Sequence, residues 1–268
     1  NTRIAADAVG ATKMDRPEWN AVNPANGEIY FTLTNNSARS VNPTGSQYLP
    51  DAANPRAYTD MKGTSSQNGN PNGHLVRLKE GATATSFTWD VYLFGAEAGA
   101  DKAMVNISAL TADKDFSSPD GLVFSKATGI CWIQTDDGAY TDVTNCMMLA
   151  AVPGSVGDGA KKTLSYTKTD GSKLDIVTPV GKPATESTLK RFLVGPKGSE
   201  ITGLAETPDG KAIFVNIQHP GEGTALANVG DATKYQSQWP ANAGYGAGKR
   251  PRSATIVITK NDGGVIGT

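Results

Sequence analysis

The stretch from Glu200 to Glu222, EITGLAETPDGKAIFVNIQHPGE, decides the fold of this chain. It opens with a carboxylate, Glu200, and reaches a turn at Thr207–Gly210, where proline and glycine stand at positions that tight turns favour. The turn is followed by Lys211–Gln218, a short segment rich in β-branched and aromatic residues. The stretch is therefore predicted to form two strands joined by a turn, with an acidic residue at the start.

The same pattern occurs twice more, earlier in the chain. In each copy an acidic residue is followed nine or ten positions later by a glycine, and then by a strand. The pairs of acid and glycine are Glu18 with Gly27, Asp120 with Gly129, and Glu200 with Gly210. Copies of one supersecondary unit arranged around an axis would bring the three carboxylates together.

Composition supports a β-rich protein and excludes several functions. The chain has 268 residues, with 30 glycines, 15 prolines and 19% charged residues, which is typical of strands separated by turns. Its formal net charge of -1 provides no general field that would attract nucleic acid or a membrane surface. No apolar run approaches the length needed to span a bilayer.

Further strands and long loops surround the repeated units. Gly73–Leu78 and Thr85–Phe94 are predicted to be outer strands of a sheet, and Ala254–Thr259, ATIVIT, a terminal strand. A terminal strand that joins the sheet of the other terminus would close a ring of repeats. Long loops are expected at 35–72, 96–114, 154–188 and 223–249. The loop at 35–72 is either a lid or rim loop or plain surface coil.

A repeat of this kind favours β-propeller blades of four strands with insertions, so the chain is expected to form a single all-β propeller domain over residues 1–268. Three blades do not close a propeller ring, so the chain looks like part of one, with the rest supplied by another segment. The chain begins at Asn1 with no initiator methionine and no signal peptide. Either a targeting segment has been removed or the chain belongs to a longer polypeptide.

Converging carboxylates need a counter-charge, because the desolvation of each buried, unpaired carboxylate costs on the order of several kcal/mol. Hard cations such as Ca²⁺ accept carboxylate oxygens and remove this cost. Alternatively, the acids cap turns or pair with arginines, and both interpretations stay open at this point. The arginines concerned are Arg16, Arg250 and Arg252. Arg16 and Glu18 lie two residues apart, so on a strand they face the same side. They either form a plain ion pair, or Glu18 holds a cation while Arg16 binds the anion of a ligand.

Cysteine and histidine contribute little to the prediction. Cys131 lies in an apolar strand and is expected to be a buried, inert thiol, and a disulfide with Cys146 has no support from the sequence. His74 is expected to be a surface strand residue, since no second histidine or cysteine stands at metal-ligand spacing.

Four motifs together carry a family resemblance that extends from Met14 to Gly267. They are MDRPEW (14–19), FSSPDGL with WIQTD (116–122 and 132–136), SEITGLAETPDGKAIFVNIQHPGE (199–222) and RPRSATIVITK (250–260). With these motifs the chain resembles the C-terminal portion of the PhoX class of bacterial alkaline phosphatases. The resemblance implies a secreted or periplasmic phosphomonoesterase with a six-bladed propeller. It also implies several Ca²⁺ ions and two oxo-bridged iron ions (Fe³⁺) in the active site.

The resemblance also assigns roles to individual residues. Glu18 matches a metal-binding carboxylate and Arg16 a phosphate-contacting arginine, while Asp120 and Glu200 resemble further metal ligands. Three other residues are candidates near the site, namely Gln134, Gln218 and His219. The iron-ligating cysteine of the family belongs to its N-terminal half, and neither Cys131 nor Cys146 stands in a matching motif. The cluster is therefore expected to be incomplete without the missing N-terminal half as a partner.

Two other functions remain open. One is a non-catalytic, calcium-stabilised propeller that binds a partner. The other is a lactonase-like propeller hydrolase with one divalent ion, since SPDGL followed by a glycine and an aromatic strand resembles that group as well. Serine-hydrolase chemistry is disfavoured, because neither of the two histidines lies in a nucleophile motif. Phosphate-binding loops and dinucleotide fingerprints are absent from the sequence.

Overall fold

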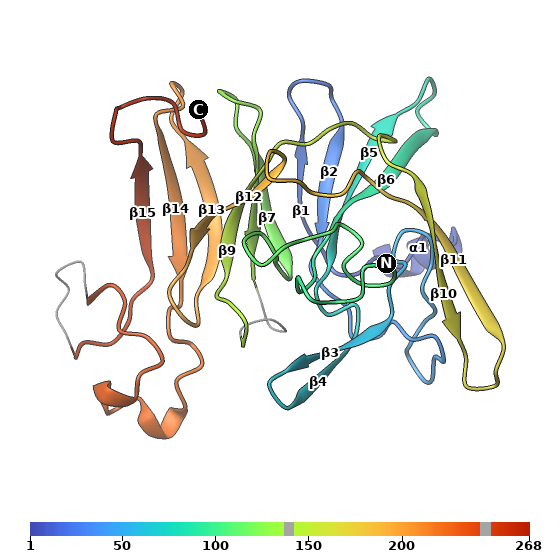
Figure 1. Cartoon of the computed structure of the whole chain (residues 1–268), viewed down its shortest axis with the longest axis horizontal. Helices are drawn as coiled ribbons and strands as arrows, with labels where there is room; N and C mark the ends of the chain where they lie inside the picture. Colours follow the sequence, from blue (N-terminus) through green and yellow to red (C-terminus); the bar gives the residue numbers. More distant parts are fainter. Residues whose placement is uncertain (137–141, 242–247) are drawn as a thin grey trace.

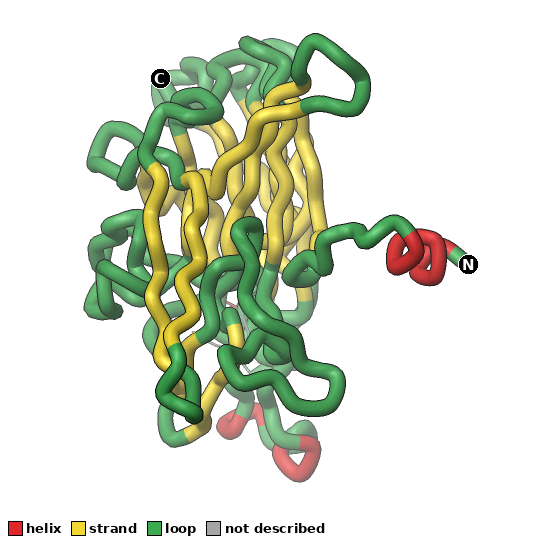
Figure 2. Tube along the Cα trace, turned by 90° about the vertical axis from the view of Figure 1, so that its right-hand side faces the viewer, coloured by secondary structure: helices red, strands yellow, loops and turns green. Residues whose placement is uncertain are grey.

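The computed structural model is almost entirely built of antiparallel β-sheets (Figure 1). It describes residues 1–136, 142–241 and 248–268. A short helix, α1 (Thr2–Ala8), precedes the first strand, buries no residue and stands apart from the sheets in Figure 2. The strands run side by side along the body of the molecule, with loops gathered at both ends of the sheets (Figure 2).

The first sheet has the order β1-β2-β5-β6. Its strands are β1 (Pro17–Val22), β2 (Ile29–Leu33), β5 (His74–Glu80) and β6 (Phe87–Phe94). The prediction that the segments now seen as β5 and β6 form outer strands is confirmed. The inner part of the sheet is therefore made by the first copy of the repeated unit.

The second sheet is built in the same way and has the order β12-β9-β8-β7. Its strands are β7 (Pro119–Phe124), β8 (Cys131–Thr135), β9 (Met147–Ala151) and β12 (Leu189–Val194). Strands β7 and β8 are the second copy of the repeated unit and again lie at one edge. Two of the three sheets thus match the predicted four-stranded blade.

The third sheet departs from the prediction in two ways. It contains three strands, β13 (Glu200–Glu206), β14 (Ala212–Gln218) and β15 (Ala254–Thr259), in the order β13-β14-β15. The terminal strand β15 does not join the sheet of the other terminus, as was expected for ring closure. It pairs with β14 from Ala212 opposite Thr259 to Ile217 opposite Ala254. This pairing lets Ile256 and Ile258 pack on the core shared with the second sheet.

The three sheets lie next to one another, and their first strands are in contact. Strand β7 contacts β1 and β2 on one side and β13 on the other. Figure 1 shows the same order, with the third sheet in orange, the second in green and the first in blue. Each junction holds an apolar core. One core includes Tyr30, Phe116 and Leu149, and the other includes Trp132 and Ile213.

The predicted loops contain more structure than expected. The segment 35–72 holds a hairpin of β3 (Tyr58–Lys62) and β4 (Ser65–Gly69). It is not plain surface coil, because Arg56 within it is fully buried and donates to the carbonyls of Gly95 and Val105 at 2.7 and 2.9 Å. The segment 154–188, expected as a long loop, contains a hairpin of β10 (Lys161–Thr167) and β11 (Lys173–Pro179). Two short 3-10 turns, Leu226–Asn228 and Ala232–Lys234, lie within 223–249.

His74 is buried, and the prediction of a surface position was wrong. The loop 35–72 covers this part of the first sheet, so the alternation of polar and apolar residues along the strand does not imply an exposed face here. The ring lies 3.0 Å from the amide nitrogen of Asn70 and 2.8 Å from the carbonyl of Ala53, and it stacks on Phe94. Burial, aided by the positive charge of Arg56, lowers the pKa of His74 to about 3.

Both cysteines are buried, as expected for Cys131, and no disulfide joins Cys131 to Cys146. Cys131 packs in the core between the first two sheets and Cys146 in the core between the second and third. Burial raises the pKa of the Cys131 thiol, which keeps it protonated and unreactive. Within the described residues, no helix is long and apolar enough to cross a membrane.

Candidate functional site

Each copy of the repeated unit enters its first strand through the same local conformation. The residue two positions before each acid has a positive φ, at 52° for Arg16, 50° for Ser118 and 66° for Gly198. A positive φ is uncommon for residues other than glycine, and where such residues hold it, it is often associated with function. The acid then stands at the first or second position of the strand, so the three inner strands begin alike.

The ends of the units are also alike. The glycines that were predicted to mark the turns, Gly27, Gly129 and Gly210, have φ values of 73°, 74° and 67°. Such values lie in the left-handed region, which glycine adopts without a steric penalty. A register shift follows each acid within its strand pair. The three units therefore share the glycine turn, the register shift and the positive φ before the first strand. They place the three acids at equivalent positions.

The structure brings the predicted acids together. Because β7 lies between β1 and β13, Asp120 lies between Glu18 and Glu200. The side chains of Asp120 and Glu200 share a hydrogen bond. The hydroxyl of Thr34, just after β2, approaches Asp120 Oδ1 at 3.4 Å, and that of Thr32 donates to the Asp120 carbonyl at 2.7 Å. The first sheet thus holds Asp120 by both its backbone and its side chain.

Crowding shifts the proton affinity of these carboxyls. Burial raises the pKa of Asp120, and the negative charges of Glu18 and Asp136 raise it further. The pKa of Glu200 is raised to about 7 by burial and by the charges of Asp136 and Asp120, while His219 acts in the opposite direction. Two ionised carboxylates cannot donate a hydrogen bond to each other. The arrangement therefore needs either a shared proton or a positive ion.

Arg16 forms an ion pair with Glu18, one of the two alternatives left open by the sequence, with 3.7 Å between Nη2 and Oε1. Its Nη1 donates to Asn35 Oδ1 at 3.0 Å. The guanidinium nevertheless stays accessible, because 57% of the side chain is exposed. Arg16 is therefore oriented by two neighbours and still able to contact an anion beside the acidic cluster.

The other candidates divide into two groups. Gln218 donates to Glu200 Oε2 at 2.8 Å, and His219 Nε2 lies 3.6 Å from the same oxygen, so both belong to the cluster. Gln134 is buried and donates to the carbonyl of Gly203 at 3.1 Å. It therefore links the second sheet to the third.

Asp136 is the residue that the sequence analysis missed. Its charge acts on both Asp120 and Glu200. Its backbone nitrogen donates to the carbonyl of Ser118, as that of Thr34 does to Arg16, so Asp136 is equivalent to a threonine in the first unit and the repeat carried no signal for it. The next residue, Asp137, is expected from its Asp-Gly sequence to be a structural turn residue, and it lies outside the described residues.

A cavity of about 160 Å³ adjoins the cluster. Asp136 and His219 line it, together with Lys62 at the end of β3 and Lys197 just before β13. Lysines that line such a cavity beside a group of carboxylates make it suitable for anions as well as cations. The hairpin β3–β4 from the loop 35–72 therefore reaches the acid-bearing end of the sheets.

The side chains at the cluster are suited to hard cations. Carboxylate and amide oxygens are the ligands that Ca²⁺ prefers, and no cysteine takes part in the contacts of Asp120 or Glu200 given above. In residues 1–136, 142–241 and 248–268, however, no three acidic, histidine or cysteine side chains stand close enough to hold a metal ion unaided. The carboxylates therefore fit Ca²⁺ by chemistry, and they would need further ligands or a small rearrangement to hold it.

Comparisons with known proteins show the family of this chain. The family model for alkaline phosphatase PhoX matches residues 1–221. A solved structure of Pseudomonas fluorescens PhoX in complex with vanadate, a transition state analogue, is 32% identical and has a TM-score of 0.67. The match covers 99% of this chain and 37% of that chain. A search of curated proteins gave no significant match. Because the family match covers most of its length, this chain belongs to the PhoX family of alkaline phosphatases.

Proposed function

We propose that this chain carries part of the active site of a metal-dependent phosphomonoesterase, located where β1, β7 and β13 begin. The observation that carries the proposal is the meeting of Glu18, Asp120 and Glu200 at equivalent positions of three repeated units, beside the accessible Arg16. Membership in the PhoX family supports it. The chain spans 37% of the matched PhoX structure, so the remaining part of the site would come from elsewhere.

The proposed architecture is a β-propeller of which the three sheets are blades. Their side-by-side order and the contacts among β1, β7 and β13 support this, because innermost strands of propeller blades line a common axis. The resemblance implies six blades, with this chain as the C-terminal part. The missing N-terminal half of the propeller is then the proposed partner, and a periplasmic or secreted location follows from the same resemblance.

Ca²⁺ is the proposed cation at the carboxylates. Glu18, Asp120 and Glu200 would be ligands, and binding would remove the repulsion that raises the pKa of Asp120 and Glu200. Fe³⁺ is implied by the family alone, and its thiolate ligand would belong to the other half. Bound cations would polarise the phosphoryl oxygens of the ester and neutralise developing charge.

Arg16 is the proposed phosphate-binding residue. Its guanidinium offers several N–H donors in a planar fork, which suits the oxygens of a phosphoryl group. Asn35 and Glu18 orient it, so it would approach the substrate without a large loss of side-chain entropy. The vanadate in the related PhoX structure supports a site for a phosphate-like group in this family.

A phosphatase assay on a protein that contains this chain tests the proposal. Removal of Ca²⁺ with a chelator is expected to abolish hydrolysis of a phosphate monoester, and added Ca²⁺ to restore it. Hydrolysis that persists after complete Ca²⁺ removal would contradict the metal-dependent role. Metal analysis of the same sample separates the alternatives, because Ca²⁺ without iron and without activity indicates a binding propeller. Activity on lactones in place of phosphate esters indicates the lactonase-like hydrolase.

A further inference from the structure

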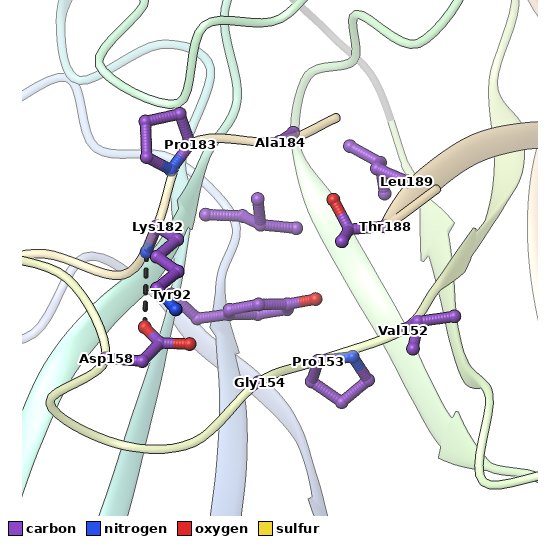
Figure 3. A pocket seen from close by; sticks show the side chains of 11 residues that line it. Tyr92, Val152, Pro153, Gly154, Asp158, Lys182, Pro183, Ala184, Thr188 and Leu189 are labelled. Carbon is purple, nitrogen blue, oxygen red and sulfur yellow. Dashed lines mark hydrogen bonds between the residues drawn. The ribbon is translucent and has the colours of Figure 1, made fainter. Parts of the chain in front are cut away.

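A second cavity lies between the first two sheets, outside the acidic cluster. Its volume is about 300 Å³. The walls are mainly apolar and include Leu93, Val152, Pro153, Pro183 and Leu189. Figure 3 shows these side chains surrounding the ring of Tyr92. This volume lies at the lower end of the range typical of small-molecule sites, and such sites are usually apolar with a few placed polar groups.

Tyr92 provides the polar group. The residue is 7% exposed, and its hydroxyl points across the cavity towards Thr188 and Val152 in Figure 3. Among the described residues no hydrogen-bond partner of this hydroxyl is present; the hydrogen bond drawn in Figure 3 joins Lys182 to Asp158. The Tyr92 hydroxyl faces the open space of the cavity, so it is available to pair with a molecule bound there.

The Tyr92 ring is held in a fixed position. Its edge meets the ring of Tyr30, with centroids 5.4 Å apart, and the guanidinium of Arg77 lies 4.9 Å from its centroid. Burial keeps the pKa of Tyr92 well above its usual value, so the hydroxyl remains a donor at neutral pH. The ring and its hydroxyl are therefore preorganised, which lowers the entropic cost of binding a ligand.

Two charged residues, Asp158 and Lys182, line the cavity, and the carboxylate of Asp158 is already engaged. Asp158 accepts from Arg77 Nη2 at 2.6 Å and from the backbone nitrogen of Lys182 at 3.2 Å. Its other oxygen accepts from the backbone nitrogen of Ser155 at 3.2 Å. The carboxylate therefore has little capacity left for a cationic ligand. A neutral ligand that is mainly apolar and brings one oxygen for the Tyr92 hydroxyl matches the mainly apolar walls.

The cavity lies at the opposite end of the second sheet from the acidic cluster. Val152 and Leu189 line it, and Leu189 pairs with Ala151, which in turn pairs with Cys131 at the start of β8. Asp120 instead lies beside Pro119, which pairs with Thr135 at the other end of β8. The two sites are therefore separated by the length of the sheet.

We infer that this cavity binds a small aromatic alcohol, with the ring between the apolar walls and the alcohol oxygen on the Tyr92 hydroxyl. A flat ring suits walls made of proline, leucine and tyrosine side chains. This site goes beyond the proposed phosphatase function. It requires neither a metal nor the carboxylates.

Titration with phenol and with toluene, followed by NMR, tests the inference. Toluene replaces the hydroxyl by a methyl group of similar size, so the pair isolates the hydrogen bond. Phenol is expected to bind with a Kd on the order of 1 mM, as a ligand this small allows. Toluene is expected to bind about fivefold more weakly. The same result is expected in chelator, which separates this site from the proposed function.

Three variants complete the test. Tyr92→Phe keeps the ring and is expected to remove the preference for phenol over toluene. Ala184→Leu extends a side chain into the cavity and is expected to abolish binding of both. Tyr166→Phe is the matched control, since it removes a buried hydroxyl that donates to Pro55 at 2.7 Å elsewhere, and phenol binding should persist. Absence of phenol binding, or an unchanged preference in Tyr92→Phe, would overturn the inference.

Discussion

Replacing Glu200 by glutamine should stabilise the metal-free protein and weaken its response to Ca²⁺. The glutamine has the shape of glutamate, can still accept from Gln218 and can donate an N–H to Asp120, which otherwise needs a proton for that hydrogen bond. The substitution therefore removes a repulsive charge when no cation is bound. It also removes a ligand when Ca²⁺ is present.

The magnitude follows from the pKa of Glu200, which is raised from 4.5 to about 7. At roughly 1.4 kcal/mol per pH unit, ionised Glu200 costs the folded protein about 3 kcal/mol. Part of this belongs to the pair with Asp120, because interacting groups titrate together, so we expect a gain of about 1–2 kcal/mol at pH 8. For a chain of this length that corresponds to an increase in Tm of about 2–8 °C.

The stability gain of Glu200→Gln depends on pH, and thermal unfolding in the presence of a chelator measures this dependence. A carboxyl with a raised pKa in the folded state contributes stability that is complete below 4.5 and lost as the pH rises through about 7. The advantage of Glu200→Gln should therefore grow between pH 5 and pH 8. With Ca²⁺ added, the wild-type protein should gain more stability than the variant, since a ligand of the folded state stabilises it in proportion to its affinity.

Glu206→Gln is the matched control. Glu206 lies at the other end of β13 and accepts from the Ser125 hydroxyl at 2.6 Å and the Lys126 backbone nitrogen at 2.9 Å. This carboxylate lies among donors, so its variant should show no gain in chelator and should keep the wild-type response to Ca²⁺. If Glu200→Gln lost stability at pH 8 in chelator and responded to Ca²⁺ like the wild type, the inference that Glu200 stands in a repulsive cation site would be refuted.

Three further predictions concern other residues. Glu18→Gln should lose bound metal and phosphatase activity together, as measured by metal analysis and hydrolysis rate, and full activity without metal would contradict its role as a ligand. Arg16→Ala should keep the metal but weaken inhibition by vanadate or phosphate by about tenfold or more, as expected when a charged hydrogen bond is lost. An unchanged inhibition constant would exclude Arg16 as the phosphate-binding residue. His74, whose pKa is lowered to about 3, should show no protonation by NMR from pH 7 down to about 4. The stability of the folded protein should fall as the pH drops below the ordinary histidine pKa of about 6.5, because the unfolded chain takes up the proton first. A His74 signal that titrates near pH 6 would show that the ring is not buried as described.

Much of the fold could be predicted because its signals are local. Turns at Gly27, Gly129 and Gly210 were predictable since few other residues adopt a positive φ without cost, and the apolar strands after them have the short, β-branched pattern of buried strands. The loop 35–72 was harder, because buried polar residues such as Arg56 and His74 depend on carbonyl acceptors supplied by distant segments. A single sequence carries no record of those acceptors.

The candidate site divides in the same way. Its acids could be predicted from their repeated position before each strand, and the resemblance assigned roles to Arg16 and Glu18. Asp136 and the lysines of the adjoining cavity could not be found by this route, because they come from strand ends and loops that differ between the copies. The partner strand of β15 was also mispredicted, since several edges were open to a strand of that pattern.

The sequence by itself determined the repeated strand pairs, their glycine turns and the carboxylate that begins each one, because these depend on the conformational preferences of neighbouring residues. Only the tertiary structure decided that β7 lies between β1 and β13, which makes Asp120 and Glu200 share a hydrogen bond and raises their pKa values. It likewise decided that the Tyr92 hydroxyl points into a cavity. The reason is physical: charge repulsion, burial and cavity shape depend on which distant segments pack together.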